Sequence, residues 1–144
     1  MKLYTGMGPN PRVVTIAIAE TSANVDIVEV DLLAGENRQG NHLGRNPAGQ
    51  IPTLELDDGS FLSEVTVIAE YIDEKQGGSL LGATAEERAE TRMWTRRIDL
   101  NIAEPMANGF RFAEGLPLFE TRIHVIPAAA DDFKQIAQEK LLWL

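Results

Sequence analysis

Residues 46–54 read NPAGQIPTL, and the chain continues with DDG at 57–59 and LSE at 62–64. This order predicts a turn, an X-Pro bond that opens a short apolar strand, a tight Asp-Gly turn and the start of a helix. An exposed backbone edge is therefore expected beside a helix N-terminus. Unpaired N–H groups at both places can bind a small peptide that carries carboxylates.

The composition is that of an ordinary folded protein without cysteine. The 144 residues suffice for one domain or two small ones, and 44% are hydrophobic and 24% charged. The formal net charge of −9 disfavours nonspecific nucleic-acid binding, and the absence of cysteine excludes disulfides and Cys-based redox chemistry. No apolar run reaches the roughly 18–20 residues that span a bilayer, and the N-terminus lacks a signal-peptide pattern. We therefore expect a cytoplasmic location and no membrane partner.

The N-terminal part predicts a strand, a helix and a second strand. Residues 2–5 and 25–30 are strand candidates, the latter because it is rich in β-branched residues. Between them, Asn10 and Pro11 predict a helix start, with asparagine as the N-cap and proline at the first helical position. The polar stretch 35–49 is expected to be loop and irregular helix.

A hairpin and a helix are expected to complete this α/β layer. Residues 53–56 and 60–62 are the hairpin strands, joined by a turn at 58–59. Apolar residues then recur at i, i+3, i+4 and i+7, which predicts an amphipathic helix. They are Val65, Ile68, Ala69 and Ile72.

Residues 76–79, QGGS, predict a boundary, because two glycines follow the end of a helix. Beyond it the pattern is helical only. Thr84 and Glu87 have the spacing of a capping box, which starts a long helix that can run toward Glu114.

Three further positions are expected to shape the helical part. Pro105 and Gly109 should bend or interrupt the long helix, and residues 115–117 predict a break. Pro127 can open a last helix. The chain ends in LLWL at 141–144 without a helix stop signal, so we expect that the natural chain continues further.

The segment QIPTL at 50–54 resembles the motif of glutathione S-transferases in which the residue before a cis proline binds the cysteinyl backbone of glutathione. By itself the segment also fits a trans proline at the start of an edge strand, since only about 5–6% of X-Pro bonds are cis. The resemblance, to bacterial-type, theta/nu-like members, favours a cis bond before Pro52. It implies a thioredoxin-like α/β glutathione-binding domain over 1–77 and a partial all-α domain over 83–144.

The helix start at 63–66 is the second part of the implied glutathione site. The N–H groups of Val65 and Thr66 can take the γ-glutamyl carboxylate, and the Glu64 carboxylate can accept from the ammonium group. The simpler alternative is that Ser63 caps the helix and Glu64 only complements its dipole. The family usually has Glu-Ser here, so Val65 removes one hydrogen bond unless Thr66 replaces it.

Three further polar residues are candidates for glutathione binding. Arg12 is expected in the first turn of a helix, where a cation is unfavourable unless an anion lies nearby, although a solvated surface arginine is equally common. Arg38 and Gln50 match positions that reach the glycyl end in the family.

The group that would activate the glutathione thiol is not obvious. The family uses a Tyr, Ser or Cys near the first strand or helix, but the serine position here is Gly8. Tyr4 is expected to be buried in the core. The catalytic candidates are Thr5 and Asn10, besides a backbone N–H of the loop 6–10, although Asn10 can also serve only as a helix cap.

In the family the helical domain lines the pocket for a hydrophobic electrophile. Met106, Phe110 and Phe112 are the candidates here, while most aromatic residues of this part are expected in the core. His42 and His124 show no metal-ligand spacing, so no metal is expected.

The implied function is glutathione binding, with glutathione as a substrate, and thiolate attack on a hydrophobic electrophile in a detoxification reaction. A homodimer is implied as well, with no nucleic-acid partner. The alternative is a noncatalytic transferase-like module for protein interaction or regulation, which Gly8 and Val65 favour. A glutaredoxin-like enzyme would need a cysteine and is rejected.

Overall fold

The computed structural model describes residues 1–78 and 80–144. Ser79, the last residue of the predicted boundary segment 76–79, lies outside the described residues. The chain divides into two compact units, Met1–Arg88 and Ala89–Leu144.

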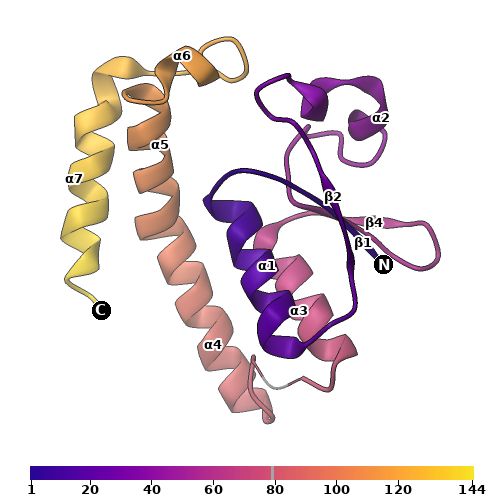
Figure 1. Ribbon diagram of the computed structural model, residues 1–144. Helices are drawn as coiled ribbons and strands as arrows, with labels where there is room; N and C mark the ends of the chain where they lie inside the picture. The colour runs from indigo at the N-terminus through magenta and orange to yellow at the C-terminus, as the bar shows by residue number, and fades with distance from the viewer. Residues whose placement is uncertain (79) are drawn as a thin grey trace. The chain divides into compact units, whose positions relative to one another are not determined.

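The first unit contains a four-stranded mixed sheet. Its strands are β1 (Lys2–Thr5), β2 (Asp26–Glu29), β3 (Thr53–Glu55) and β4 (Phe61–Leu62), in the order β2-β1-β3-β4 (Figure 1). β1 is parallel to β2, with Leu3 opposite Ile27, and antiparallel to β3, with Leu3 opposite Leu54. β3 and β4 form the predicted hairpin. The four strands predicted from the sequence are confirmed.

Helices α1 (Pro9–Thr21) and α3 (Val65–Lys75) pack side by side against the sheet (Figure 1). The core between these layers includes five fully buried apolar side chains: Leu3, Val14, Leu54, Ile68 and Ile72. Burial of each such side chain contributes about 1.5–3 kcal/mol. The apolar spacing that predicted α3 is thus confirmed as its core-facing side.

The predicted start of α1 is wrong by two residues. The helix begins at Pro9, Gly8 is its N-cap, and Asn10 lies inside its first turn. Pro9 suits the first helical position because its φ is fixed near the helical value. Gly8 can precede it with φ 133° and ψ 168°, a conformation open essentially only to glycine.

A short irregular layer, η1 (Glu36–Arg38) and α2 (Gly40–Leu43), contacts Tyr4 of β1 through His42. Tyr4 and Leu3 project to opposite faces of the sheet because side chains alternate along a strand. Tyr4 clusters there with Val30 and Ile51. The prediction of loop and irregular helix over 35–49 is confirmed.

The connection to the helical part is fixed by a buried carboxylate and a capping box. Asp73, 1% exposed, accepts hydrogen bonds from the N–H groups of Leu80 (3.0 Å) and Leu81 (3.3 Å). Glu87 accepts from the N–H of Thr84 at 3.0 Å, and the Thr84 hydroxyl accepts from the N–H of Glu87 at 3.1 Å. The predicted capping box is confirmed at the start of α4 (Ala85–Ile98).

The second unit is helical. After α4 it contains η2 (Asp99–Ala103), α5 (Glu104–Phe112), α6 (Leu116–Phe119), η3 (Pro127–Ala129) and α7 (Ala130–Leu141). The predicted long helix is interrupted by the π-helical turn η2, directly before Pro105, whose missing N–H removes a helical hydrogen bond. The predicted last helix opens at Pro127 as η3 and continues as α7.

Two expectations for this unit are met only in part. Gly109 does not interrupt α5, and a Cβ there would lie 2.7 Å from Lys134 Cγ on α7. Its lack of a side chain therefore serves close helix packing. The break predicted over 115–117 is present, but it lies at residues 113–115, since Pro117 occupies the first turn of α6, where its missing N–H is tolerated. Within residues 1–78 and 80–144, no helix has the length and hydrophobicity to span a bilayer.

Candidate functional site

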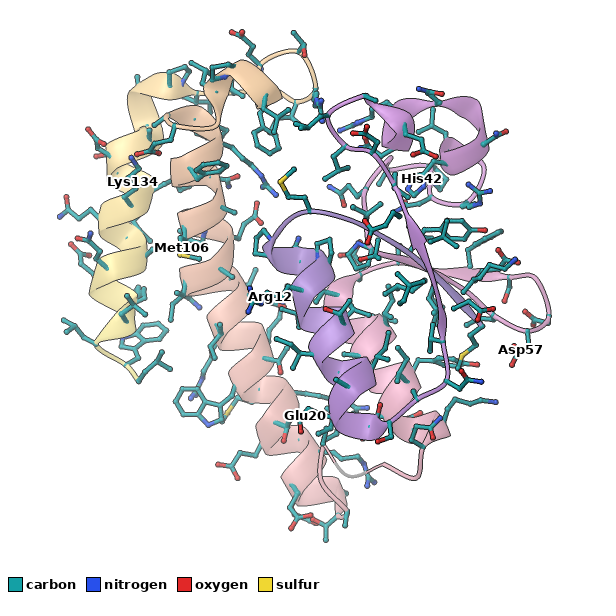
Figure 2. All side chains as sticks on the ribbon, viewed as in Figure 1. Arg12, Glu20, His42, Asp57, Met106 and Lys134 are labelled. Carbon is teal, nitrogen blue, oxygen red and sulfur yellow. The ribbon has the colours of Figure 1, made fainter. Side chains whose placement is uncertain are left out.

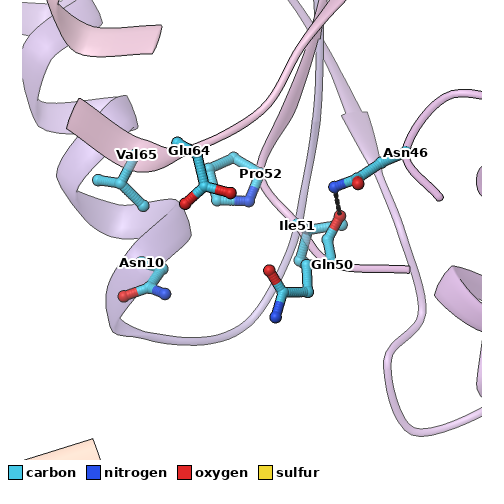
Figure 3. A pocket seen from close by; sticks show the side chains of 7 residues that line it. All are labelled: Asn10, Asn46, Gln50, Ile51, Pro52, Glu64 and Val65. Atoms are coloured by element: carbon cyan, nitrogen blue, oxygen red, sulfur yellow. Dashed lines mark hydrogen bonds between the residues drawn. The ribbon is translucent and has the colours of Figure 1, made fainter. Parts of the chain in front are cut away.

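A small pocket in the first unit brings together three segments. Asn10 comes from α1, residues 46 and 50–52 from the segment before β3, and Glu64 and Val65 from the start of α3. Figure 3 shows the polar ends of Asn10, Gln50 and Glu64 around one opening. The peptide bond between Ile51 and Pro52 is cis, as predicted.

Ile51 offers an unpaired backbone edge. Its side chain is buried against Tyr4 and Val30, whereas its N–H and C=O have no hydrogen-bond partner in the described part of the chain. An extended peptide could pair with both groups, as a further strand pairs with the edge of a sheet.

The start of α3 is a second set of free donors. Glu64 is the N-cap, and its carbonyl accepts from the N–H of Ile68 at 2.9 Å. The amides of the first three helical residues, 65–67, have no acceptor among the described residues. Glu64, and not Ser63, is the N-cap, and its side chain makes no capping hydrogen bond. The alternative in which Ser63 caps this helix is therefore wrong.

Glu64 has an unusual backbone conformation. Its φ of 72° and ψ of 122° fall in a region that side-chain-bearing residues rarely adopt. Such a conformation costs about 1–3 kcal/mol and is typical of functional sites. Here it accompanies a carboxylate that lines the pocket beside the positive end of α3.

Buried polar side chains hold the segment that carries Ile51. The amide group of Asn37 donates to the Gly49 carbonyl at 2.6 Å, and that of Asn46 donates to the Gln50 carbonyl at 3.0 Å. His42 Nε2 also binds the Gln50 carbonyl, at 2.9 Å. All three side chains are at most 5% exposed. Their burial was not predicted, because polar residues in a predicted loop look solvent-exposed.

The predicted catalytic residues take different positions. Asn10 is exposed and lines the pocket. Thr5, 2% exposed, does not line it, and its hydroxyl is buried without a hydrogen-bond partner among the described residues. Gly8 supplies no hydroxyl group. A free hydroxyl at Thr5 and an amide at Asn10 are thus the neutral donors near the start of α1.

Tyr4 is a core residue, as predicted. Its hydroxyl donates to Glu55 Oε2 on β3 at 2.7 Å, and Arg45 lies over its ring at 4.2 Å from the centroid. The hydrogen bond to Glu55, together with burial, raises the pKa of Tyr4. The same hydrogen bond lowers the pKa of Glu55. The Tyr4 hydroxyl is therefore committed to Glu55 and does not line the pocket.

Three of the other predicted binding residues lie outside the pocket lining. Arg12 is exposed near the N-terminal end of α1, and it makes no ion pair with the described residues (Figure 2). Arg38 is exposed on η1, where its stem lies against Gly49, since a Cβ at Gly49 would be 3.1 Å from Arg38 Cδ. Thr66 is half-buried and follows the lining residue Val65.

The candidates for a hydrophobic substrate lie on α5. Met106 and Phe110 are 59% and 50% exposed, whereas Phe112 is 7% exposed and packs edge-to-face against Phe133, with ring centroids 5.7 Å apart. Figure 2 shows Met106 on α5 and Lys134 on the neighbouring α7. In residues 1–78 and 80–144, no three His, Cys, Asp or Glu side chains are placed to hold a metal ion.

Comparisons with known proteins identify the family of this chain. The model of the family "Glutathione S-transferase, N-terminal domain" matches residues 1–74. Glutathione S-transferase 2 of Saccharomyces cerevisiae is 38% identical over 112 residues, which are 76% of this chain and 48% of that protein. The chain thus spans about half the length of this relative.

Solved structures extend the likeness to the whole chain. A glutathione S-transferase domain-containing protein of Marinobacter aquaeolei VT8 superposes with a TM-score of 0.91 at 36% identity, covering 100% of this chain and 72% of that one. Gtt2 from Saccharomyces cerevisiae superposes with a TM-score of 0.88 at 31% identity, covering 99% and 71%. The thioredoxin-like α/β domain followed by a helical region is confirmed. The chain belongs to the glutathione S-transferase family.

Proposed function

We propose that this protein binds glutathione in the pocket of the first unit and presents its thiol to a hydrophobic electrophile. The observation that carries the proposal is the convergence of three groups on one opening: the unpaired edge at Ile51, the free amides at the start of α3 and the Glu64 carboxylate. The name of the yeast relative, a glutathione S-transferase, supports the same reading.

Each end of glutathione has a complementary group. The γ-glutamyl carboxylate would accept from the amides of Val65 and Thr66, and its ammonium group would donate to Glu64. The cysteinyl backbone would pair with Ile51. Two residues would contact the glycyl end. They are Gln50, which is exposed and lines the pocket, and Arg38, whose stem lies against Gly49.

Thiol activation would rely on neutral donors. The Asn10 side chain is available in the pocket, and the Thr5 hydroxyl has no other described partner. A donor that hydrogen-bonds the thiolate favours the charged form and lowers the pKa of the thiol. Arg12, in the first turn of α1, would add a positive charge to the surroundings. Of the three candidates on α5 for a hydrophobic co-substrate, Met106 and Phe110 are exposed, whereas Phe112 is buried against Phe133.

A second function, glutathione binding without catalysis, is favoured by one observation. Gly8 stands where the family has a hydroxyl residue, and its backbone conformation suits only glycine. Such a protein would use the same pocket for regulation or protein interaction. The homodimer expected for the family belongs to either version of the proposal.

Calorimetric titration with glutathione, combined with ultraviolet detection of thiolate, tests the proposal and separates the two versions. Saturable binding with thiolate absorbance at neutral pH supports catalysis. Saturable binding with an unshifted thiol pKa supports the noncatalytic version. No saturable binding contradicts both.

Variants assign the thiol-activating group. Thr5→Val and Asn10→Ala should each raise the pKa of bound glutathione if the residue contacts the sulfur. Thr21→Val is the matched control for Thr5→Val, because the Thr21 hydroxyl donates within α1, to the Ala17 and Ile18 carbonyls. It should leave the thiol pKa unchanged.

A further inference from the structure

The carbonyl of Gln50 receives an unusual number of hydrogen bonds. His42 Nε2 lies 2.9 Å from this oxygen, Asn46 Nδ2 lies 3.0 Å from it, and the Thr53 hydroxyl lies 3.2 Å from it. A carbonyl oxygen has two lone pairs, so three donors exceed its ordinary capacity. Figure 3 shows the hydrogen bond from Asn46 to this oxygen.

His42 is committed to this contact. A carbonyl oxygen can only accept, so Nε2 must carry the proton and donate. The other ring nitrogen, Nδ1, is buried without a partner among the described residues. An unpaired buried acceptor is unfavourable, and an apolar side chain would avoid it. The donor function of Nε2 therefore explains the presence of histidine better than packing does.

Asn46 connects the donors to one another. Its Nδ2 also donates to the Thr53 hydroxyl at 3.3 Å, and its Oδ1 accepts from the N–H of Ala48 at 3.1 Å. Asn46 and Thr53 are 4% and 0% exposed. Hydrogen bonds in such a connected network strengthen one another in the low dielectric of the interior.

The Gln50 carbonyl shares one planar peptide unit with the N–H of Ile51. This peptide bond is trans, since Ile51-Pro52 is the cis bond found in the described chain. In a trans unit the C=O and N–H groups point in opposite directions. Three donors on the buried side therefore turn the Ile51 N–H away from them and polarise it as a donor.

We propose that His42 and Asn46 are positioning residues for the Ile51 amide, which they orient and strengthen for pairing with a carbonyl of the bound peptide. This inference rests on the proposed function for its ligand, glutathione. It goes beyond that function by assigning part of the affinity of the edge to His42, which does not line the pocket, and to the hydrogen bond from Asn46 to the Gln50 carbonyl. The Asn37 side chain donates to the neighbouring Gly49 carbonyl, which belongs to a different peptide unit, the one between Gly49 and Gln50.

Nuclear magnetic resonance of the ligand-free protein tests the positioning step. Loss of a hydrogen bond to a carbonyl moves its ¹³C resonance and the ¹⁵N resonance of the following residue upfield. We expect this for Gln50 and Ile51 in His42→Phe, with recovery in His42→Gln, whose amide can donate from the position of Nε2. In the matched control Asn37→Ala, the corresponding shifts should appear at Gly49 and Gln50.

A glutathione titration of the same variants tests the consequence. His42→Phe should bind glutathione about threefold to tenfold more weakly, the effect of one hydrogen bond, and His42→Gln should recover. If His42→Phe unfolds, Thr53→Val provides a folded variant, because valine is close to isosteric with threonine. Its glutathione affinity should also fall, but by less than in His42→Phe.

The two proposals fail in distinguishable ways. Unchanged Gln50 and Ile51 resonances, or an unchanged affinity in His42→Phe and Thr53→Val, would overturn the positioning role. If wild-type protein does not bind glutathione, the proposed function fails, and the resonances of the free protein alone decide whether His42 and Asn46 orient the amide.

Discussion

The two helix starts at the pocket are built differently. The first turn of α1 contains Pro9 and Pro11, which have no N–H, so Asn10 is the one residue of its first three that retains an amide donor. The first turn of α3 has no proline, and the amides of residues 65–67 are unpaired within the described chain. The start of α3 therefore offers three free amide donors to an anionic group, whereas the first three residues of α1 offer one.

The flanking charges fit the same division. Arg12 follows the proline-containing turn of α1, where it adds the positive charge that few amides supply. Glu64 precedes α3 and can balance the ammonium group beside the carboxylate. A zwitterionic γ-glutamyl end therefore suits α3, and a thiolate suits α1.

The largest effect is expected when α3 is made like α1. Val65→Pro places proline at the first helical position, where helices tolerate it, and removes one amide donor. Loss of a hydrogen bond to a charged group costs about 1.5–3 kcal/mol. Calorimetry should therefore show glutathione binding weakened about tenfold to a hundredfold.

Ala85→Pro is the control for this variant, because it places proline at the first position of α4. Glutathione affinity should not change there. Equal affinity of Val65→Pro and wild type, with the helix content intact by circular dichroism, would show that the α3 amides do not bind the ligand.

A hydroxyl at the start of α1 should be costly. Gly8→Ser must adopt φ 133° and ψ 168° or move the chain, so we expect a loss of about 1–3 kcal/mol in the free energy of unfolding by urea titration. Gly40→Ser serves as control, because Gly40 has no positive φ and open space around its Cα. A Gly8→Ser protein as stable as wild type would mean that this turn readily accepts a side chain.

Glu64→Gly should separate stability from binding. Glycine relieves the positive φ of Glu64, so the free energy of unfolding should rise by about 1 kcal/mol while glutathione affinity falls. Ser22→Gly relieves the other positive φ of a non-glycine residue, 53°, at the far end of α1. Ser22→Gly should raise the free energy of unfolding without changing glutathione affinity. If affinity fell in Ser22→Gly as much as in Glu64→Gly, the role of the Glu64 carboxylate would be refuted.

The smallest effect is expected from the hydrogen bond between Tyr4 and Glu55, on the other face of the sheet. The Tyr4 hydrogen bond lowers the pKa of Glu55, so this stabilisation is lost as pH falls through the folded-state pKa of Glu55. The same bond raises the pKa of Tyr4 above its ordinary 10.0. The stabilisation is therefore also lost as pH rises through the folded-state pKa of Tyr4.

Tyr4→Phe removes both contributions. The difference in unfolding free energy between wild type and Tyr4→Phe should therefore be greatest at intermediate pH and narrow at both extremes. Glutathione affinity at neutral pH should be unchanged. A marked loss of glutathione affinity in Tyr4→Phe would show that the Tyr4–Glu55 pair also affects the starts of α1 and α3, which line the pocket.

The sequence was sufficient to predict the elements with strong local signals. The helix after Glu64 follows from helical periodicity, and the capping box at Thr84 and Glu87 follows from hydrogen-bond spacing. The structure has both. The cis bond at Ile51-Pro52 depended on the family resemblance, because no local rule distinguishes it from a trans bond.

What the sequence could not supply was tertiary context. Asparagine before proline predicts a helix cap at Asn10, but the preceding Gly8-Pro9 pair starts the helix two residues earlier. Gly109 looked like a helix breaker, although its role is set by the approach of Lys134 from α7. His42 and Asn46 looked like loop residues, because their burial depends on where the chain returns at Gln50.

The most direct test of the account is an amide chemical-shift titration of the ¹⁵N-labelled protein with glutathione. We expect saturable chemical-shift changes centred on the amides of Ile51, Val65 and Thr66, with smaller ones at Asn10. Absence of saturable changes, or changes centred elsewhere in the chain, would contradict it.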